Sequence, residues 1–264
     1  MRRLGIIGAG GMTQTVLAAL SGLPLDHLAV LSRTPGQAIE AWFATKVTAH
    51  TELAEFLATK PDLVAECAGH AAVRAHGAAV LASGCDLIVI SVGALADDAL
   101  LTELHNAAQR GGSRLILPAG AVGGLDALAA AKLSGLQDVV YTGSKPPAAW
   151  RGTQAEQAVD LAGLTAPVCF FEGSAREAAR TYPQNANVAA AIALAGAGFD
   201  ATRVRLVADP GITRNRHEIA VRSGCSDFSI QLEGIASAAN PKTSLMAGYS
   251  VAHAVLSRAA RVLI

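Results

Sequence analysis

The sequence predicts an α/β protein with a doubly wound parallel sheet in its N-terminal part and an α/β domain with a mixed sheet after it. An apolar run at residues 3–7 breaks into glycines and then into helix-forming residues, which is typical of a strand, a tight turn and a helix start. Short β-branched runs then alternate with helical patterns as far as residue 117, as in βαβ units. After residue 122, strand-like runs follow one another with fewer helices between them. We therefore expect a Rossmann-like domain at 1–122, a second domain at 123–240 and a closing segment at 241–264.

In the first domain, strands are expected where short apolar runs are bounded by glycine, proline or polar residues. Helices are expected where the helical pattern resumes between them, and right-handed crossovers place these helices on the sheet. The predicted strands are 3–7, 28–31, 46–48, 62–66, 86–90 and 114–117, and the predicted helices are 16–20, 51–57, 71–83 and 97–110.

In the second domain, the same criteria predict more strands than helices. Residues 144–150 contain two prolines and are expected to form an ordered surface loop. Asn240 followed by Pro241 is typical of a helix start, which predicts a helix to Leu256 that packs back on the first domain. The predicted strands are 139–142, 168–171, 204–207, 217–221 and 228–231, and the other predicted helices are 124–132, 174–179 and 187–197.

The glycine turn after the first strand is a candidate dinucleotide site. Gly8 and Gly10 occupy the first two places of a G-x-G-x-x-G pattern, and Thr13 stands in the third. Such a turn brings backbone N–H groups and a helix N-terminus close to a pyrophosphate, although glycine is also the ordinary residue of any tight turn. Small residues at the next strand ends would leave room for the ligand. The candidate cofactor residues of these turns are Gly8, Ala9, Gly10, Gly11, Met12, Ala68 and Gly69.

The end of the second strand indicates which coenzyme is accepted. NAD-selective sites carry an acidic residue there, which binds the ribose 2′-hydroxyl. This chain instead has Ser32, Arg33 and Thr34, and a guanidinium suits a 2′-phosphate. We therefore expect both NAD and NADP to be used, with NADP bound at least as tightly.

Composition excludes several classes of function. Lys plus Arg and Asp plus Glu each number 21, so the totals give no basis for binding nucleic acid or an anionic membrane. The apolar runs are too short for a membrane span. The cysteines at positions 67, 85, 169 and 225 are far apart and lack ligand spacing, which favours four buried, reduced thiols over a metal site. We expect a cytoplasmic protein without a metal.

One histidine of seven is a candidate for chemistry. His217 lies between Arg214, Arg216 and Glu218 at a strand entrance, and such neighbours can tune an imidazole across neutrality. The other six occur in contexts where a packed or solvated histidine is the ordinary explanation. The asparagines and glutamine of 182–190 exceed what one helix cap requires. The ordinary interpretation keeps one Asn as the cap, and the functional interpretation directs the others at a ligand amide.

Four motifs of the second part resemble those of the L-aspartate dehydrogenase family. They are Phe171–Ala179, Tyr182–Ala190, Lys145–Thr153 and Asn240–Ser244, and the similarity spans nearly the whole chain. The resemblance implies a Rossmann domain that binds NAD or NADP and a second domain that supplies the substrate pocket and dimer contacts. It also implies that His217 is the catalytic histidine and that Ala121 and Asn187 bind the cofactor. The chain departs from the family at Thr13, where a smaller residue is usual.

The predicted reaction is reversible oxidation of L-aspartate to iminosuccinate, which yields oxaloacetate and ammonia or enters NAD biosynthesis. Cations are required for two substrate carboxylates, and one amine proton must be moved. A related two-domain reductase, of the homoserine dehydrogenase or dihydrodipicolinate reductase type, is the enzyme alternative, and a non-catalytic dinucleotide sensor is the other. The candidate carboxylate partners are Arg214, Arg216, Lys242, Thr243 and Ser244.

Overall fold

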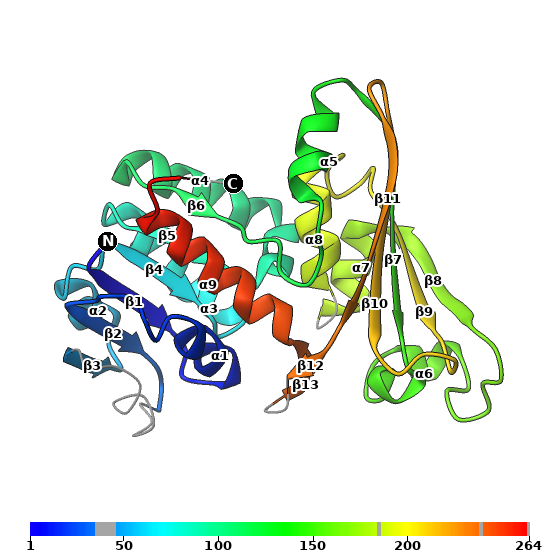
Figure 1. Cartoon of the computed structure of the whole chain (residues 1–264), viewed down its shortest axis with the longest axis horizontal. Helices are drawn as coiled ribbons and strands as arrows, with labels where there is room; N and C mark the ends of the chain where they lie inside the picture. Colours follow the sequence, from blue (N-terminus) through cyan, green and yellow to red (C-terminus); the bar gives the residue numbers. More distant parts are fainter. Residues whose placement is uncertain (35–45, 184–185, 238–239, 263–264) are drawn as a thin grey trace. The chain divides into compact units, whose positions relative to one another are not determined.

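The computed structural model describes residues 1–34, 46–183, 186–237 and 240–262 (Figure 1). The chain folds into two compact units. The first unit consists of Met1–Gly120 and Ala247–Ile264, and the second of Ala121–Met246.

The first unit contains a six-stranded sheet in which every described strand pair is parallel. Its strand order, β3-β2-β1-β4-β5-β6, is that of a doubly wound dinucleotide-binding sheet. The predicted fold class is therefore confirmed for this unit. The strands are β1 Arg3–Ile7, β2 His27–Leu31, β3 Lys46–His50, β4 Leu63–Glu66, β5 Asp86–Val89 and β6 Leu115–Ile116. The helices are α1 Gly11–Ala19, α2 Leu53–Ala58, α3 His70–Ala82, α4 Asp98–Gly111 and α9 Leu245–Ala259, with a 3-10 turn η2 at Val92–Ala96.

The last helix, α9, shares a hydrophobic core with α1 and the sheet. Buried Val251 and Val255 belong to the same cluster as Ile6 and Val16. The helices approach closely at Gly248, where an added Cβ would lie 2.6 Å from Thr15 Cγ2. Although α9 follows the second unit in sequence, it therefore completes the core of the first.

The second unit contains a five-stranded sheet in the order β11-β10-β7-β9-β8. β7 and β9 are parallel and the other neighbours are antiparallel, so the mixed sheet predicted for this part is confirmed. The strands are β7 Leu136–Lys145, β8 Val168–Ser174, β9 Arg203–Ala208, β10 Asn215–Ser223 and β11 Asp227–Gly234, with a small pair β12 Ala236–Ser237 and β13 Asn240–Ser244. The helices are α5 Leu125–Lys132, α6 Ala155–Ala158, α7 Ala175–Thr181 and α8 Ala186–Ala195, with a 3-10 turn η3 at Pro147–Trp150.

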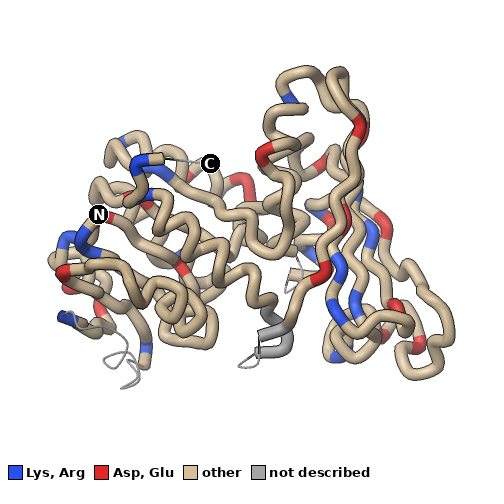
Figure 2. Tube along the Cα trace, in the orientation of Figure 1, with Lys and Arg blue, Asp and Glu red and all other residues tan. Residues whose placement is uncertain are grey.

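The two faces of this sheet differ in polarity because side chains alternate along each strand. One face carries Tyr141, Leu206 and Ile219, which are buried. The other carries charged residues, and ion pairs cross it from strand to strand. Figure 2 shows Lys and Arg positions alternating with Asp and Glu positions along the chain trace of these strands. A polar side chain that is buried on the first face therefore needs a hydrogen-bond partner or a functional role.

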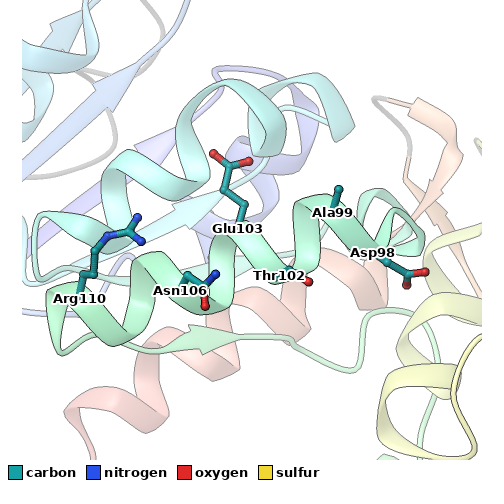
Figure 3. Close-up of a pocket in the computed structure, with 6 residues that line it drawn as sticks. All are labelled: Asp98, Ala99, Thr102, Glu103, Asn106 and Arg110. Carbon is teal, nitrogen blue, oxygen red and sulfur yellow. The ribbon is translucent and has the colours of Figure 1, made fainter.

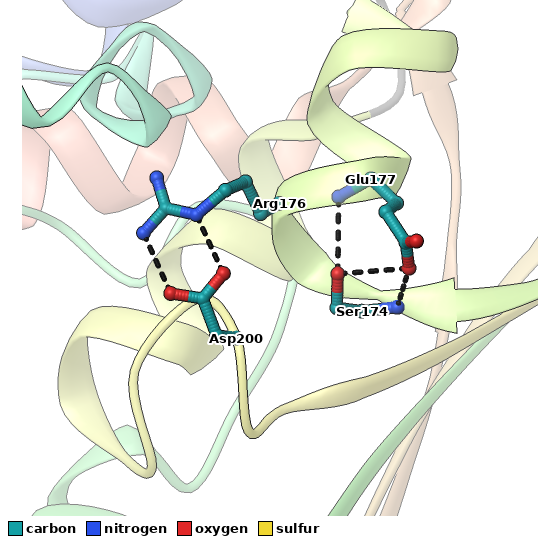
Figure 4. Close-up of polar contacts among 4 residues, drawn as sticks. All are labelled: Ser174, Arg176, Glu177 and Asp200. Carbon is teal, nitrogen blue, oxygen red and sulfur yellow. Dashed lines mark hydrogen bonds and ion pairs between the residues drawn. The ribbon is translucent and has the colours of Figure 1, made fainter.

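Helix α7 begins with a capping box, which explains why the sequence turns from strand to helix there. The Ser174 hydroxyl accepts from the Glu177 backbone N–H, and the Glu177 carboxylate accepts from the Ser174 N–H at 2.7 Å (Figure 4). This reciprocal pair satisfies two donors that a helix start leaves free. Next to it, Arg176 forms two hydrogen bonds with Asp200.

Three local predictions are wrong. Asn240–Ser244 forms strand β13, paired with β12, and α9 begins only at Leu245, because strand pairing outweighs the local capping signal. Residues 144–150 are not a surface loop, since the Trp150 ring is fully buried and its Nε1 donates to the Val207 carbonyl. The four cysteines are free, but only Cys67 and Cys85 are buried.

Within the described residues, no helix is long and apolar enough to cross a membrane. Those residues also contain no group of three or more His, Cys, Asp or Glu side chains that could hold a metal ion.

Candidate active site

The turn after β1 has the geometry that the glycine pattern predicts. Gly8 has a φ of 109°, a conformation that L side chains rarely adopt. An added Cβ would lie 3.0 Å from both the Cys67 carbonyl oxygen and Ala68 Cβ. The Gly8 N–H donates to the Leu31 carbonyl at 2.8 Å. Glycine at this position therefore allows the ends of β1, β2 and β4 to approach one another.

The start of α1 is open and suited to an anion. Gly10 occupies the N-cap position, and no side chain caps the helix. A Cβ added at Gly10 would meet no atom within 4 Å. Gly11 and Met12 are the first helical residues, and Ala9 precedes the cap. A helix start with uncapped N–H groups and open space beside it fits a pyrophosphate.

Thr13 explains how the chain tolerates its departure from the glycine pattern. Its side chain is 1% exposed, and its hydroxyl donates to the Gly8 carbonyl at 2.9 Å. The position thus accommodates a larger residue than glycine, because the added hydroxyl has a buried partner. The hydrogen bond joins the turn directly to α1.

The residues after β2 lie at the same edge of the sheet. The Ser32 N–H donates to the His50 carbonyl, and the Ser32 hydroxyl lies 3.2 Å from the Thr34 carbonyl oxygen. Arg33 and Thr34 are exposed. The short turn therefore leaves the Arg33 side chain accessible to solvent.

Glu66, at the end of β4, is a residue that sequence reasoning did not single out as part of the site. Its side chain is fully buried, and Oε1 accepts from the N–H groups of Ala68 at 2.7 Å and Gly69 at 2.6 Å. Ser91 adds a hydroxyl donor at 3.0 Å to Oε1 and an N–H donor at 3.2 Å to Oε2. Burial raises the pKa of Glu66, and these hydrogen bonds oppose that rise. The carboxylate thereby fixes the turns that follow β4 and β5.

The second unit places His217 on the buried face of its sheet. His217 is 5% exposed, and its Nδ1 lies 2.8 Å from the Tyr141 hydroxyl. It pairs across the strands with Gly143, where an added Cβ would lie 2.6 Å from that same hydroxyl. Glycine between the two rings therefore gives Tyr141 the room to reach the imidazole.

Burial and a nearby cation control the charge of this imidazole. Burial first, and the Lys145 ammonium second, lower the pKa of His217 to about 4. Burial also lowers the pKa of Lys145 to about 8 and raises the pKa of Tyr141 above its usual value. Near neutral pH, His217 and Tyr141 are uncharged, and Lys145 titrates within reach of physiological pH.

The predicted carboxylate partners are not all near His217. Arg216 precedes it on β10, so its side chain points to the opposite face, where it bonds Glu233 at 3.0 Å. The prediction that placed Arg216 beside His217 is therefore wrong. Arg214 is exposed, in the turn before β10. Ser244 has a buried hydroxyl with no hydrogen-bond partner among the described residues. The side chains of Lys242 and Thr243 lie outside what the structure describes.

The two remaining candidate cofactor residues belong to the second unit. Ala121 is buried at its start, and Asn187 is half-buried in the first turn of α8. Gln184 and Asn185, two of the polar residues before this helix, lie outside the described residues.

A groove of about 590 Å³ lies on the outer side of α4 (Figure 3). All of its lining residues come from that one helix, and none is a candidate site residue. The groove is open to solvent and is lined by a single helix, so it does not compete with the glycine turn or His217 as the active site.

A parallel sheet in this strand order, with an open glycine turn leading into its first helix, is the arrangement of nucleotide-dependent oxidoreductases. The sequence comparisons agree with that class. Residues 4–118 match the family described as homoserine dehydrogenase, NAD binding domain, and residues 126–258 match the family described as aspartate dehydrogenase, C-terminal.

Full-length relatives specify the family. The L-aspartate dehydrogenase of Ruegeria pomeroyi is 48% identical over 261 residues, which cover 98% of this chain and 94% of the relative. The L-aspartate dehydrogenase of Polaromonas sp. is 43% identical over 98% of both chains. A crystal structure of aspartate dehydrogenase from Thermotoga maritima shares the fold, with a TM-score of 0.79, 24% identity and coverage of 100% of this chain and 99% of that one. The chain belongs to the L-aspartate dehydrogenase family.

Proposed function

We propose that this chain catalyses the reversible NAD(P)-dependent oxidation of L-aspartate to iminosuccinate, which water converts to oxaloacetate and ammonia. The observation that carries the proposal is the similarity to relatives named L-aspartate dehydrogenase over 98% of the chain. The proposal extends to NAD biosynthesis, in which a quinolinate synthase would consume the iminosuccinate.

The first unit is proposed to hold the coenzyme. Residues 8–12 would bind the pyrophosphate, with Ala68 and Gly69 beside it and Glu66 fixing their backbone. Ala121 and Asn187 are proposed as further contacts. When bound, the coenzyme supplies the hydride acceptor. The chain's own residues must then position L-aspartate and move the protons.

His217 is proposed as the catalytic histidine. Its pKa of about 4 keeps it neutral near pH 7, so one ring nitrogen can accept a hydrogen bond or a proton. The Tyr141 hydroxyl on Nδ1 orients the ring and leaves Nε2 as the nitrogen for the substrate or for the attacking water. General acid–base catalysis by a positioned side chain typically raises the reaction rate about 10²–10⁴-fold.

The substrate carboxylates are proposed to bind Arg214 and the 242–244 segment. The unpartnered buried hydroxyl of Ser244 supports this assignment, because a buried donor without a partner is costly unless a ligand satisfies it. Arg216 is left out, since Glu233 already neutralises it on the opposite face.

Coenzyme selection is proposed to depend on Arg33. Since the turn after β2 carries no acid and exposes Arg33, both coenzymes should bind, with NADP at least as tight as NAD.

We further propose a cytoplasmic homodimer in which residues 123–240 supply the substrate pocket and the dimer contacts. Sedimentation of the purified chain would test this state, and a monomer at catalytic concentrations would contradict it.

The function is tested by following coenzyme reduction at 340 nm with a panel of substrates. L-aspartate should reduce NAD and NADP, and homoserine should not. Turnover of homoserine or of a dihydrodipicolinate instead would favour the related reductases. Tight coenzyme binding without turnover of any substrate would favour a dinucleotide sensor.

A further inference from the structure

The buried face of the five-stranded sheet brings three polar residues together around a glycine. His217 on β10 is directly opposite Gly143 on β7. Tyr141 and Lys145 lie two residues to either side of Gly143, so all three side chains stand on the same face. Diagonal neighbours across an antiparallel pair lie about 7–8 Å apart, within reach of long side chains. His217 is therefore flanked by a phenol on one side and an amine on the other.

The Lys145 amine packs beside an aromatic ring. Its Nζ lies 5.0 Å from the centroid of the buried Trp150 ring, and Trp150 packs edge-on against Tyr182. On the β9 side, the Lys145 carbonyl accepts from the Asp209 N–H, while the Asp209 carboxylate accepts from the Gly211 N–H at 2.8 Å. Burial lowers the pKa of Lys145, and burial together with the Lys145 cation lowers the pKa of His217. Burial therefore favours the neutral form of both groups.

We propose that Lys145 is a second catalytic residue of the reaction, which accepts the proton of the substrate α-ammonium while His217 acts at the imine. The proposal rests on the proposed function. In its unprotonated form, the Lys145 amine with a pKa of about 8 is a stronger base than an imidazole with a pKa of about 4, and this form becomes available as the pH rises toward 8. Lys145 would then take up the proton of the substrate ammonium, and His217 would act at the imine.

The proposed oxidation transfers one proton to Lys145 and one hydride to the coenzyme. An N–H bond of the substrate ammonium breaks, and its proton forms a bond to Lys145 Nζ. The electron pair left on the substrate nitrogen forms the C=N bond as the Cα–H leaves as a hydride to the oxidised nicotinamide coenzyme. In the reverse direction, the protonated Lys145 returns its proton to the new amine.

Two substitutions separate proton transfer from charge. Lys145→Arg keeps a cation but cannot deprotonate, and Lys145→Met removes both. We expect both variants to lose about 10²–10⁴-fold in kcat/KM for L-aspartate. Wild-type kcat/KM should rise with pH and level off above an inflection near 8. Both Lys145 variants should lack that inflection, and His217→Asn should be slow but keep it.

The matched control is Lys132→Met, in which an exposed lysine at the end of α5 is changed. Its rate and pH profile should equal those of the wild type. Recovery of at least a tenth of wild-type activity in Lys145→Arg would overturn the proposal, because charge alone would then suffice. An unchanged inflection in either Lys145 variant would overturn it as well.

A second measurement does not depend on turnover. The chain has five lysines, at positions 46, 60, 132, 145 and 242, so reductive methylation with ¹³C-formaldehyde gives a simple NMR spectrum. The signal absent from Lys145→Arg belongs to Lys145. It should titrate near pH 8, well below the ordinary lysine value of about 10.4, and titration near that ordinary value would overturn the proposal. If L-aspartate is not oxidised by the wild type, the proposed function fails while this measurement still reports on Lys145.

Discussion

Replacing Lys145 by methionine should make the folded protein more stable at neutral pH. Burial lowers the pKa of this lysine from 10.5 to about 8. At about 1.4 kcal/mol for each tenfold change in proton affinity, holding the charged amine in the folded state costs about 3 kcal/mol at pH 7. Methionine has a similar length and no charge to desolvate. The contacts of the amine are lost as well, and the one with the Trp150 ring alone offsets about 0.5–2 kcal/mol, so we expect a net gain that stays below about 3 kcal/mol.

The gain should depend on pH in a defined direction. Below pH 8, Lys145 is protonated in both the folded and the unfolded state, and the full penalty applies. Between pH 8 and 10.5 the unfolded chain binds more protons than the folded one, so the free energy of unfolding of the wild type rises with pH. Above 10.5 the amine is neutral in both states. The advantage of Lys145→Met should therefore shrink across this window.

Urea unfolding at pH 7 and pH 10 measures both effects. Lys132→Met is the control, because an exposed substitution of this kind changes stability by no more than about 0.5 kcal/mol. A Lys145→Met protein that is less stable than the wild type at pH 7, with the same difference at pH 10, would refute the reasoning. The contacts of the amine would then outweigh the cost of burying its charge in the folded state.

Five further substitutions test the rest of the site. Gly8→Ala should lower the melting temperature, because the residue has a positive φ and close neighbours, whereas Gly10→Ala should melt as the wild type and raise the coenzyme KM; equal melting temperatures for the two variants would contradict this. His217→Asn should lower kcat by about 10²–10⁴-fold with coenzyme binding retained, and loss of stability alone would make the residue structural. Arg33→Ala should weaken NADP binding about 10-fold or more and leave NAD binding unchanged; a wild type that already prefers NAD tenfold would contradict the premise. Glu66→Gln turns an amide toward the Ser91 N–H and should reduce stability by about 1–3 kcal/mol and raise the coenzyme KM, which calorimetry and initial rates would measure.

The fold was accessible from the sequence where the signal is local. Most strands of the first sheet are short apolar runs, and the turn at Gly8 needs a residue that adopts a positive φ. The strand at Asn240–Ser244 could not be predicted in this way. Asn240 and Pro241 are typical of a helix start, yet β13 forms because its partner β12 lies a few residues before it. A local capping signal does not report such pairing.

The site was only partly accessible because its residues meet through strand register. Tyr141 and His217 are 76 positions apart, and their hydrogen bond exists because β7 and β10 are adjacent in one particular register. Arg216 seemed to belong with His217 by proximity in sequence, but neighbours on a strand face opposite sides. Glu66 ends an apolar strand, where an acid that must be buried was a usable signal. Only the structure shows which N–H groups satisfy it.

The same register explains why two bases can be held close together on a buried face. Protonating His217 beside a charged Lys145 would put two cations into an apolar region, so the first proton goes to the lysine, whose affinity is higher. Between about pH 4 and pH 8 the pair therefore carries one proton, and it resides on Lys145. Above pH 8 the pair carries none, and both groups can accept. Oxidation of an amino acid releases a proton and reductive amination consumes one. Under the roles proposed for His217 and Lys145, the charge state of this pair would therefore couple the direction of catalysis to pH, through residues that the sheet register brings together.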